Sequence, residues 1–276
     1  MKIGVIPFLN VKPLIYKLEE ACLVIDKSVE LVYEYPATLS NLLKNGEIDV
    51  GIIPTIDYFR GMGKFVIPQI CISSYGKVAS VRLFYKDEIS RIKQVAVDKG
   101  SSTSIALLRI ILSEVYSISP LFKEITPVLP QALEENEAVL LIGDQALTTS
   151  GKSIDLGEEW YKLTQLPFVY ALWVIRDGLE DYREIVSLIV ESKEFGIRNL
   201  NEIVRNESER LSLSKELVSN YLKQIIRYDL KRLELKGILK FVHYAFKHKL
   251  IEKEREIEFC TTSNFRYGIK RREAKF

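Results

Sequence analysis

Side chains that can hydrogen-bond to a ligand follow several apolar runs of this chain, at points where buried strands are expected to end. In α/β folds such loops meet in one crevice, where ligands bind. Nearly all of these side chains carry a hydroxyl or an amide group; they are Asn10, Thr55, Ser73, Ser74, Ser80, Ser101, Ser102, Thr103, Ser104 and Asp144. Uncharged donors of this kind suit a small molecule that bears carboxylate or phosphate groups. The sequence therefore predicts a pocket for a small anion.

Asn10 lies in the opening stretch IGVIPFLNVKPL, between an expected strand at 3–6 and a helix expected to begin at Pro13. Proline suits the first helical position, where its missing N–H costs nothing. Lys12 would then cap the helix, so Asn10 lies two positions too early for that task. Closing a turn is the simpler interpretation of Asn10 from this stretch alone, and a ligand contact is the alternative.

The run SSTS, residues 101–104, comes at the start of a helix expected from about 103 to 116. Free N–H groups and the positive end of the helix dipole favour an anion at such a position. Ser102 or Thr103 would cap this helix. Capping does not exclude a ligand that uses the remaining donors.

Motifs of several common enzyme classes are missing from the sequence. It contains no G-x-S-x-G elbow, no G-x-G-x-x-G after a strand and no P-loop, which argues against a serine hydrolase, a dinucleotide enzyme and a nucleotide hydrolase. The only histidines, His243 and His248, would share one helical face without a nearby set of acidic or cysteine ligands, so no metal site is expected. Cys22, Cys71 and Cys260 are far apart and fit buried thiols in a reducing compartment better than disulfides.

Composition limits the partners of the chain. Its 276 residues are 47% hydrophobic, and 39 Lys and Arg against 37 Asp and Glu give a formal charge of +2. This balance offers no general attraction to nucleic acid or to a membrane surface. The chain enters a strand directly after Met1 and Lys2, so neither a secretory signal nor a membrane span is expected. We therefore expect a cytoplasmic protein without a cofactor; the sequence gives no indication of its oligomeric state.

Apolar runs alternate with helical patterns through the first two thirds of the chain, which predicts largely parallel sheets and an α/β fold. One sheet would come from residues 1–87 and the other from 93–165, with crossings at 82–95 and 165–176. The expected domains are a first lobe of residues 1–87 plus 172–251, which ends in a helical C-terminal region, a second lobe of 88–171, and a tail of 252–276. Two lobes joined by two crossings form a cleft that can close on a ligand.

Six stretches, in this order, resemble the chorismate dehydratase family of the futalosine route to menaquinone. They are IGVIPFLNVKPLIYKL, GEIDVGIIPTIDY, ICISSYGKVASVRLF, SSTSIALLRIIL, VLLIGDQAL and DLGEEWYKLTQLPFVYALW. The resemblance runs from about residue 3 to 251. It implies the two-lobed fold of type II periplasmic binding proteins and the removal of water from chorismate, which gives 3-[(1-carboxyvinyl)oxy]benzoate. Chorismate is then the expected small-molecule partner.

The resemblance also implies roles for particular residues. Asn10 and Ser80 are the expected catalytic residues: Asn10 would bond the substrate near its reacting edge, and Ser80 would grip a carboxylate or orient the leaving hydroxyl. Substrate-binding roles fall to Ser101, Thr103 and Ser104 at the helix start, and to Thr55 and Asp144. The base that removes the proton is either the enolpyruvyl carboxylate of the substrate or Asp144.

Two departures from the family pattern bear on affinity and substrate identity, because Ser102 and Tyr75 stand where relatives often carry arginine.

Two other functions remain open. The related enzyme that cleaves cyclic dehypoxanthine futalosine would need a different N-terminal loop and a histidine in the cleft, and the first histidine here is His243. A cytosolic anion-binding protein of the same fold would have a similar pocket without catalysis.

Overall fold

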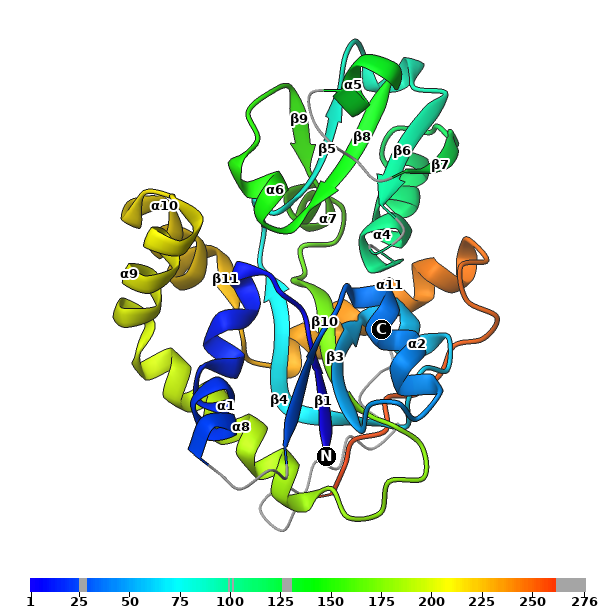
Figure 1. Ribbon diagram of the computed structural model, residues 1–276. Coiled ribbons are helices and arrows are strands. Elements are labelled where there is room, and N and C mark those ends of the chain that lie inside the picture. Colours follow the sequence, from blue (N-terminus) through cyan, green and yellow to red (C-terminus); the bar gives the residue numbers. More distant parts are fainter. Residues whose placement is uncertain (25–28, 99, 101, 126–130, 262–276) are drawn as a thin grey trace.

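The computed structural model of this chain describes residues 1–24, 29–98, 100, 102–125 and 131–261. These residues form two lobes, each built on a β-sheet, and two short segments of chain cross between the lobes (Figure 1). The first sheet has the strand order β11-β4-β10-β3-β1-β2, and the second has the order β7-β6-β8-β5-β9.

The first lobe contains the larger sheet and the described helices after residue 180 (Figure 1). Its strands are β1 (Lys2–Val5), β2 (Glu30–Tyr33), β3 (Val50–Pro54), β4 (Phe65–Ser74), β10 (Phe168–Ile175) and β11 (Ile226–Arg227). Its helical elements are η1 (Leu9–Val11), α1 (Lys12–Val24), α2 (Pro36–Lys44), α3 (Thr55–Phe59), α8 (Arg183–Arg198), α9 (Leu200–Leu211), α10 (Lys215–Asn220), the π-helical turn η3 (Tyr221–Ile225) and α11 (Arg232–Lys247).

The second lobe comes from one continuous part of the chain. Its strands are β5 (Val81–Tyr85), β6 (Gln94–Asp98), β7 (Leu121–Ile125), β8 (Ala138–Ile142) and β9 (Ser153–Asp155). Its helical elements are η2 (Ile89–Arg91), α4 (Ser102–Glu114), α5 (Gln131–Glu135), α6 (Gly143–Thr148) and α7 (Leu156–Thr164).

Both sheets are mixed, and the prediction of largely parallel sheets was wrong. β1 pairs in parallel with β2 and β3, but β10 runs antiparallel to β3 and β4. In the second sheet β6 is parallel to β7 and β8, whereas β5 is antiparallel to β8 and β9. Two of the antiparallel strands, β5 and β10, each follow a crossing, which brings the chain into the sheet from the opposite end. The third, β11, runs antiparallel to β4 and follows the helices of the first lobe.

The sheets also correct the expected crossings. β5 belongs to the second sheet and the whole of β10 to the first, so the crossings lie at 75–80 and 165–167 rather than at 82–95 and 165–176. The periodicity of an apolar strand is the same in either sheet, and it could not decide between them. The division of the chain into domains stays a prediction, for which the sheets favour boundaries near residues 75 and 167.

Local patterns account for several elements. Pro36 begins α2, whose Leu39 and Leu43 are buried, and Gly46 follows the helix with a φ of 74° that favours glycine. The alternating apolar stretch QVAVD forms β6. The chain from 183 to 247 is mainly helical, as predicted, with η3 and the short β11 between its helices.

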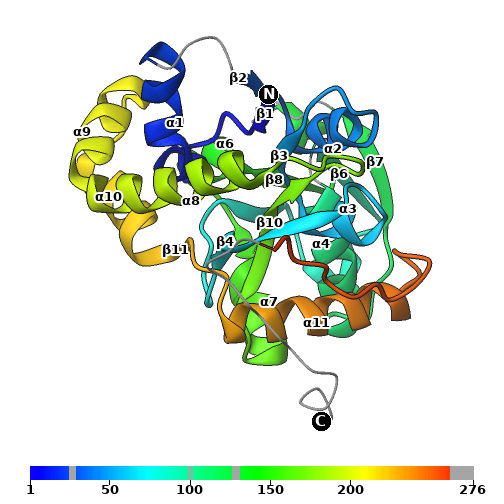
Figure 2. The ribbon, with the colours of Figure 1, turned by 90° about the horizontal axis from the view of Figure 1, so that it is seen from below.

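Helix α11 contacts both lobes. It packs against β10 of the first sheet and against α4 of the second lobe, and it lies beside α7 in the view of Figure 2. At its end the Lys247 ammonium and the His248 ring bond the Glu114 carboxylate at 2.7 and 2.6 Å. His248 is partly buried and His243 is exposed.

The cysteines that the structure describes with their side chains, Cys71 and Cys260, are free and buried. Burial raises the pKa of Cys71 to about 12 and that of Cys260 to about 11, so both stay protonated and unreactive.

Over the described ranges, no helix has the length and apolarity to cross a membrane. The same part of the chain holds no cluster of His, Cys, Asp and Glu that suits a metal ion. From the expected tail, the structure describes residues 252–261.

Candidate functional site

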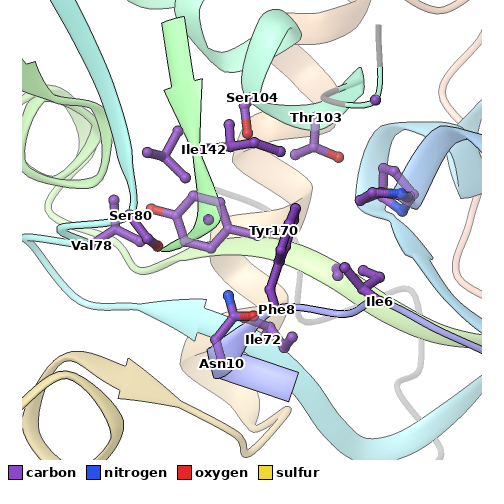
Figure 3. Close-up of a pocket in the computed structure, with 16 residues that line it drawn as sticks. Ile6, Phe8, Asn10, Ile72, Val78, Ser80, Thr103, Ser104, Ile142 and Tyr170 are labelled. Carbon is purple, nitrogen blue, oxygen red and sulfur yellow. The ribbon is translucent and has the colours of Figure 1, made fainter. Parts of the chain in front are cut away.

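A pocket lies where the two lobes face each other (Figure 3). Residues of the first lobe line one side: Ile6, Phe8, Asn10, Pro36, Pro54, Ile72, Tyr170 and Ala171. Residues of the first crossing and the second lobe line the other: Val78, Ser80, Val81, Gly100, Thr103, Ser104, Ile142 and Gly143. Four of the expected site residues therefore share one cavity, and most of its wall is apolar.

Asn10 reaches the pocket from the loop between β1 and α1. The helix begins at Lys12, one residue earlier than predicted, and the turn η1 precedes it. The Asn10 Oδ1 is buried without a hydrogen-bond partner among the described residues. Asn10 therefore lies in a turn, as the simpler interpretation had it, while its carboxamide faces the cavity beside Phe8 and Tyr170 (Figure 3).

Ser80 ends the first crossing and is 2% exposed. Its backbone oxygen accepts the N–H of Gly143 at 2.8 Å, and its hydroxyl accepts a hydrogen bond from Tyr221 Oη at 2.8 Å. The crossing before it is held by Asp155, whose carboxylate accepts the N–H groups of Val78 and Ala79. Ser80 is thus fixed by its own backbone, by the segment before it and by Tyr221.

Asp155 serves two elements at once. Besides its bonds to the crossing, it accepts the N–H groups of Gly157 and Glu158 and so caps α7. Burial raises the pKa of Asp155, and these backbone donors act in the opposite direction. A Cβ on Gly157 would lie 2.5 Å from Gly76 O, so glycine is required where α7 meets the crossing.

Helix α4 presents Thr103 and Ser104 to the pocket. It begins at Ser102, and Thr103 does not cap it: the Thr103 hydroxyl instead accepts the N–H of Ile56 in α3 at 3.1 Å. The Ser102 side chain bonds Asp57 of the first lobe, where burial raises the pKa of the carboxyl and this bond lowers it. Ser101 lies outside the described residues.

Thr55 and Asp144 do not line the pocket. Thr55 is fully buried at the start of α3, and its Oγ1 has no hydrogen-bond partner in the described parts of the chain. Asp144, in α6, uses Oδ1 to accept the N–H of Leu9 at 3.0 Å. Burial raises the pKa of Asp144, and the bond to Leu9 lowers it. Asp144 therefore joins the second lobe to the loop that carries Asn10.

The serines at the end of β4 point elsewhere. Ser73 donates to the backbone oxygen of Arg227, and Ser74 bonds Gly76 O and, at 3.1 Å, the Tyr170 hydroxyl. Tyr75 is exposed and packs edge-on against Tyr161 with ring centroids 4.9 Å apart. Ser74 supports the pocket through Tyr170, and the other two residues do not touch it.

The expectation from the sequence omitted the apolar wall and Tyr221. Phe8 belongs to the PFLN stretch and Tyr170 to the long apolar strand, so both lay within quoted motifs whose polar members alone were considered. Tyr221 is 141 positions from Ser80 and follows a polar helix, and no local pattern marks it.

A family model described as menaquinone biosynthesis matches residues 1–247. The chain belongs to this family. Its curated relatives include a chorismate dehydratase of Thermus thermophilus, 26% identical over 260 residues that cover 87% of this chain and 93% of the relative. A chorismate dehydratase of Campylobacter jejuni is 25% identical over 248 residues, with 88% and 96% covered.

Solved structures similar to this member of the menaquinone biosynthesis family show its fold. A protein from Archaeoglobus fulgidus superposes with a TM-score of 0.73 at 21% identity, covering 91% of this chain and 98% of the other. The alkanesulfonate-binding protein of Xanthomonas axonopodis gives a TM-score of 0.64 at 15% identity, with 92% and 94% covered. The chain therefore has the two-lobed periplasmic-binding-protein fold that the sequence resemblance implied.

Proposed function

We propose that this protein is a chorismate dehydratase, which removes water from chorismate and gives 3-[(1-carboxyvinyl)oxy]benzoate. The observation that carries the proposal is the pocket between the lobes, where Asn10 and Ser80 face the start of α4 across an apolar wall. Two relatives with this name, similar over most of the chain, support it.

The pocket wall suits the parts of this substrate. Phe8, Ile72 and Tyr170 offer apolar and aromatic surface to the six-membered ring. The carboxylates would bind neutral donors at the edges of the pocket, namely the hydroxyls of Thr103 and Ser104 and the N-terminal end of α4, a helix of 13 residues. Among the described residues that line the pocket none is charged, so binding would depend on hydrogen bonds rather than on ion pairs.

The reaction breaks the C3–H bond and the C4–O bond and forms an aromatic ring. The C3 proton passes to a base, and the C4 hydroxyl leaves with a proton as water, so that atoms and charge balance. Ser80 would donate to the leaving hydroxyl, and the free Oδ1 of Asn10 would accept a hydrogen bond from the substrate. The enolpyruvyl carboxylate would serve as the base, because Asp144 already bonds Leu9 and lies outside the pocket wall. The protein would thus supply mainly orientation and stabilisation of developing charge.

The test is to incubate the purified protein with chorismate and to separate the products by liquid chromatography with mass detection. We expect stoichiometric formation of the aryl enol ether, and S80A should lower kcat strongly. S73A is the matched control, because Ser73 points to Arg227 O and away from the pocket. Chorismate that binds but stays unchanged would contradict the proposal and favour an anion-binding protein.

A further inference from the structure

Tyr221 is a buried tyrosine from the helical C-terminal region that touches the proposed catalytic serine. It is 1% exposed and begins η3, the π-helical turn between α10 and β11. π-Helical turns are rare and are often found at functional sites. The Tyr221 hydroxyl donates to Ser80 Oγ at 2.8 Å in a buried environment.

The Tyr221 phenol is held in its protonated form. Burial is the largest effect and raises the pKa of Tyr221, and the nearby charges of Asp144 and Asp155 raise it further, whereas hydrogen bonds with the side chains of Ser80 and Asn10 lower it. Tyr221 therefore keeps its proton, and this proton goes to Ser80.

A serine hydroxyl has one proton to donate. Because Ser80 Oγ accepts from Tyr221, the Ser80 proton must point away from Tyr221, and the pocket that Ser80 lines lies there. The hydrogen bond from Tyr221 thus sets the donor role of Ser80.

We propose that Tyr221 is a positioning residue, which orients the Ser80 hydroxyl so that Ser80 donates its hydrogen bond into the pocket. The inference rests on the proposed function, in which Ser80 donates to the leaving hydroxyl. Tyr221 does not touch the substrate and acts through Ser80.

The kinetic test is a double-mutant cycle with Y221F and S80A. Y221F keeps the ring and removes only the hydroxyl. We expect its kcat to fall roughly tenfold, the scale of one orienting hydrogen bond, with KM within about twofold of the parent. In the S80A background the same change should have no further effect, because the residue through which Tyr221 acts is gone. An equal fold loss in both backgrounds would overturn the proposal.

Y228F is the matched control. Tyr228 is also a buried tyrosine, seven positions further along, and its hydroxyl has no hydrogen-bond partner among the described residues. We expect the kcat of Y228F to stay within about twofold of the parent, since removing an unbonded hydroxyl of the same shape is nearly neutral. A loss in Y228F that equals the loss in Y221F would show a structural effect and overturn the proposal.

Crystal structures of the parent and of Y221F keep the inference testable whatever the substrate. We expect Ser80 in one rotamer in the parent and in a different or divided rotamer in Y221F; the parent rotamer at full occupancy in Y221F would overturn the proposal. A parent protein that leaves chorismate unchanged would overturn the proposed function alone.

If Y221F does not fold, 3-fluorotyrosine can be placed at position 221 instead. We expect kcat to change at least about twofold, because the hydrogen bond to Ser80 then has a more acidic donor. An unchanged kcat would overturn the role of Tyr221.

Discussion

At the scale of single residues, the site contains polar atoms with no partner in the described chain, which is uncommon for buried groups. The Oδ1 of Asn10 is such an atom, and it lies on a residue that lines the pocket. A buried acceptor left unbonded costs about 1–3 kcal/mol. A ligand that donates a hydrogen bond to Asn10 would recover this cost, which is why the free oxygen favours a binding role over turn closure alone.

Asp144 is the residue whose role a single substitution decides. D144N keeps an oxygen for the Leu9 N–H but removes the negative charge that a general base needs. We expect kcat for chorismate to stay within about threefold of the parent, because a base of this kind is worth about 10²–10⁴-fold and Asp144 is not used as one. Steady-state kinetics measures the effect. A hundredfold loss in a folded D144N protein would make Asp144 the base.

At the scale of elements, the first crossing depends on one carboxylate. Asp155 accepts N–H groups from the crossing and from the first turn of α7, so an amide in its place would turn an NH₂ group toward these donors. We expect D155N to lower the free energy of unfolding by about 1–3 kcal/mol.

Chemical denaturation measures this loss, with D87N as control, since Asp87 is an exposed residue of the same charge. The control should change the free energy of unfolding by less than about 0.5 kcal/mol. If D155N and D87N have equal stability, the carboxylate does not hold the crossing.

Sequence patterns account for single helices and strands better than for the way in which the strands pair. Pro36, Leu39 and Gly46 act within a few positions of one another, so they specify α2 without the rest of the fold. The sequences of β5 and β10 predict extended strands but do not show which sheet each strand joins. That choice is made by pairing with strands far along the chain, β8 for β5 and β3 for β10. The same distinction holds in the site: short motifs pointed to Asn10 and Ser80, whereas Tyr221 reaches Ser80 only through the folding of the C-terminal helices.

At the scale of the whole molecule, hydrogen bonds join the lobes in the structure. The Leu9 N–H is donated to Asp144, and the Ile56 N–H is donated to Thr103. Each bond links a backbone group of the first lobe to a side chain of the second, next to the pocket. Two-lobed proteins of this fold open and close by hinge motion, so such bonds favour the closed arrangement.

T103V tests this point, because valine keeps the shape of threonine and leaves the Ile56 N–H without its acceptor. We expect a radius of gyration larger than that of the parent, for which about 19 Å is usual at this length. Small-angle X-ray scattering measures the change. T148V is the control, since the Thr148 hydroxyl bonds only within α6. Identical scattering from T103V and the parent would show that the Thr103 bond does not hold the lobes together.

The interrupted first sheet has a consequence for synthesis on the ribosome. β10 lies between β3 and β4, yet it is translated only after the entire second lobe. The early strands therefore emerge with an open edge on each side of the missing strand, while the second lobe can fold as soon as it leaves the exit tunnel. A nascent chain that stalls before Phe168 would expose these edges, and it is the form of this protein most prone to aggregate and most in need of a chaperone.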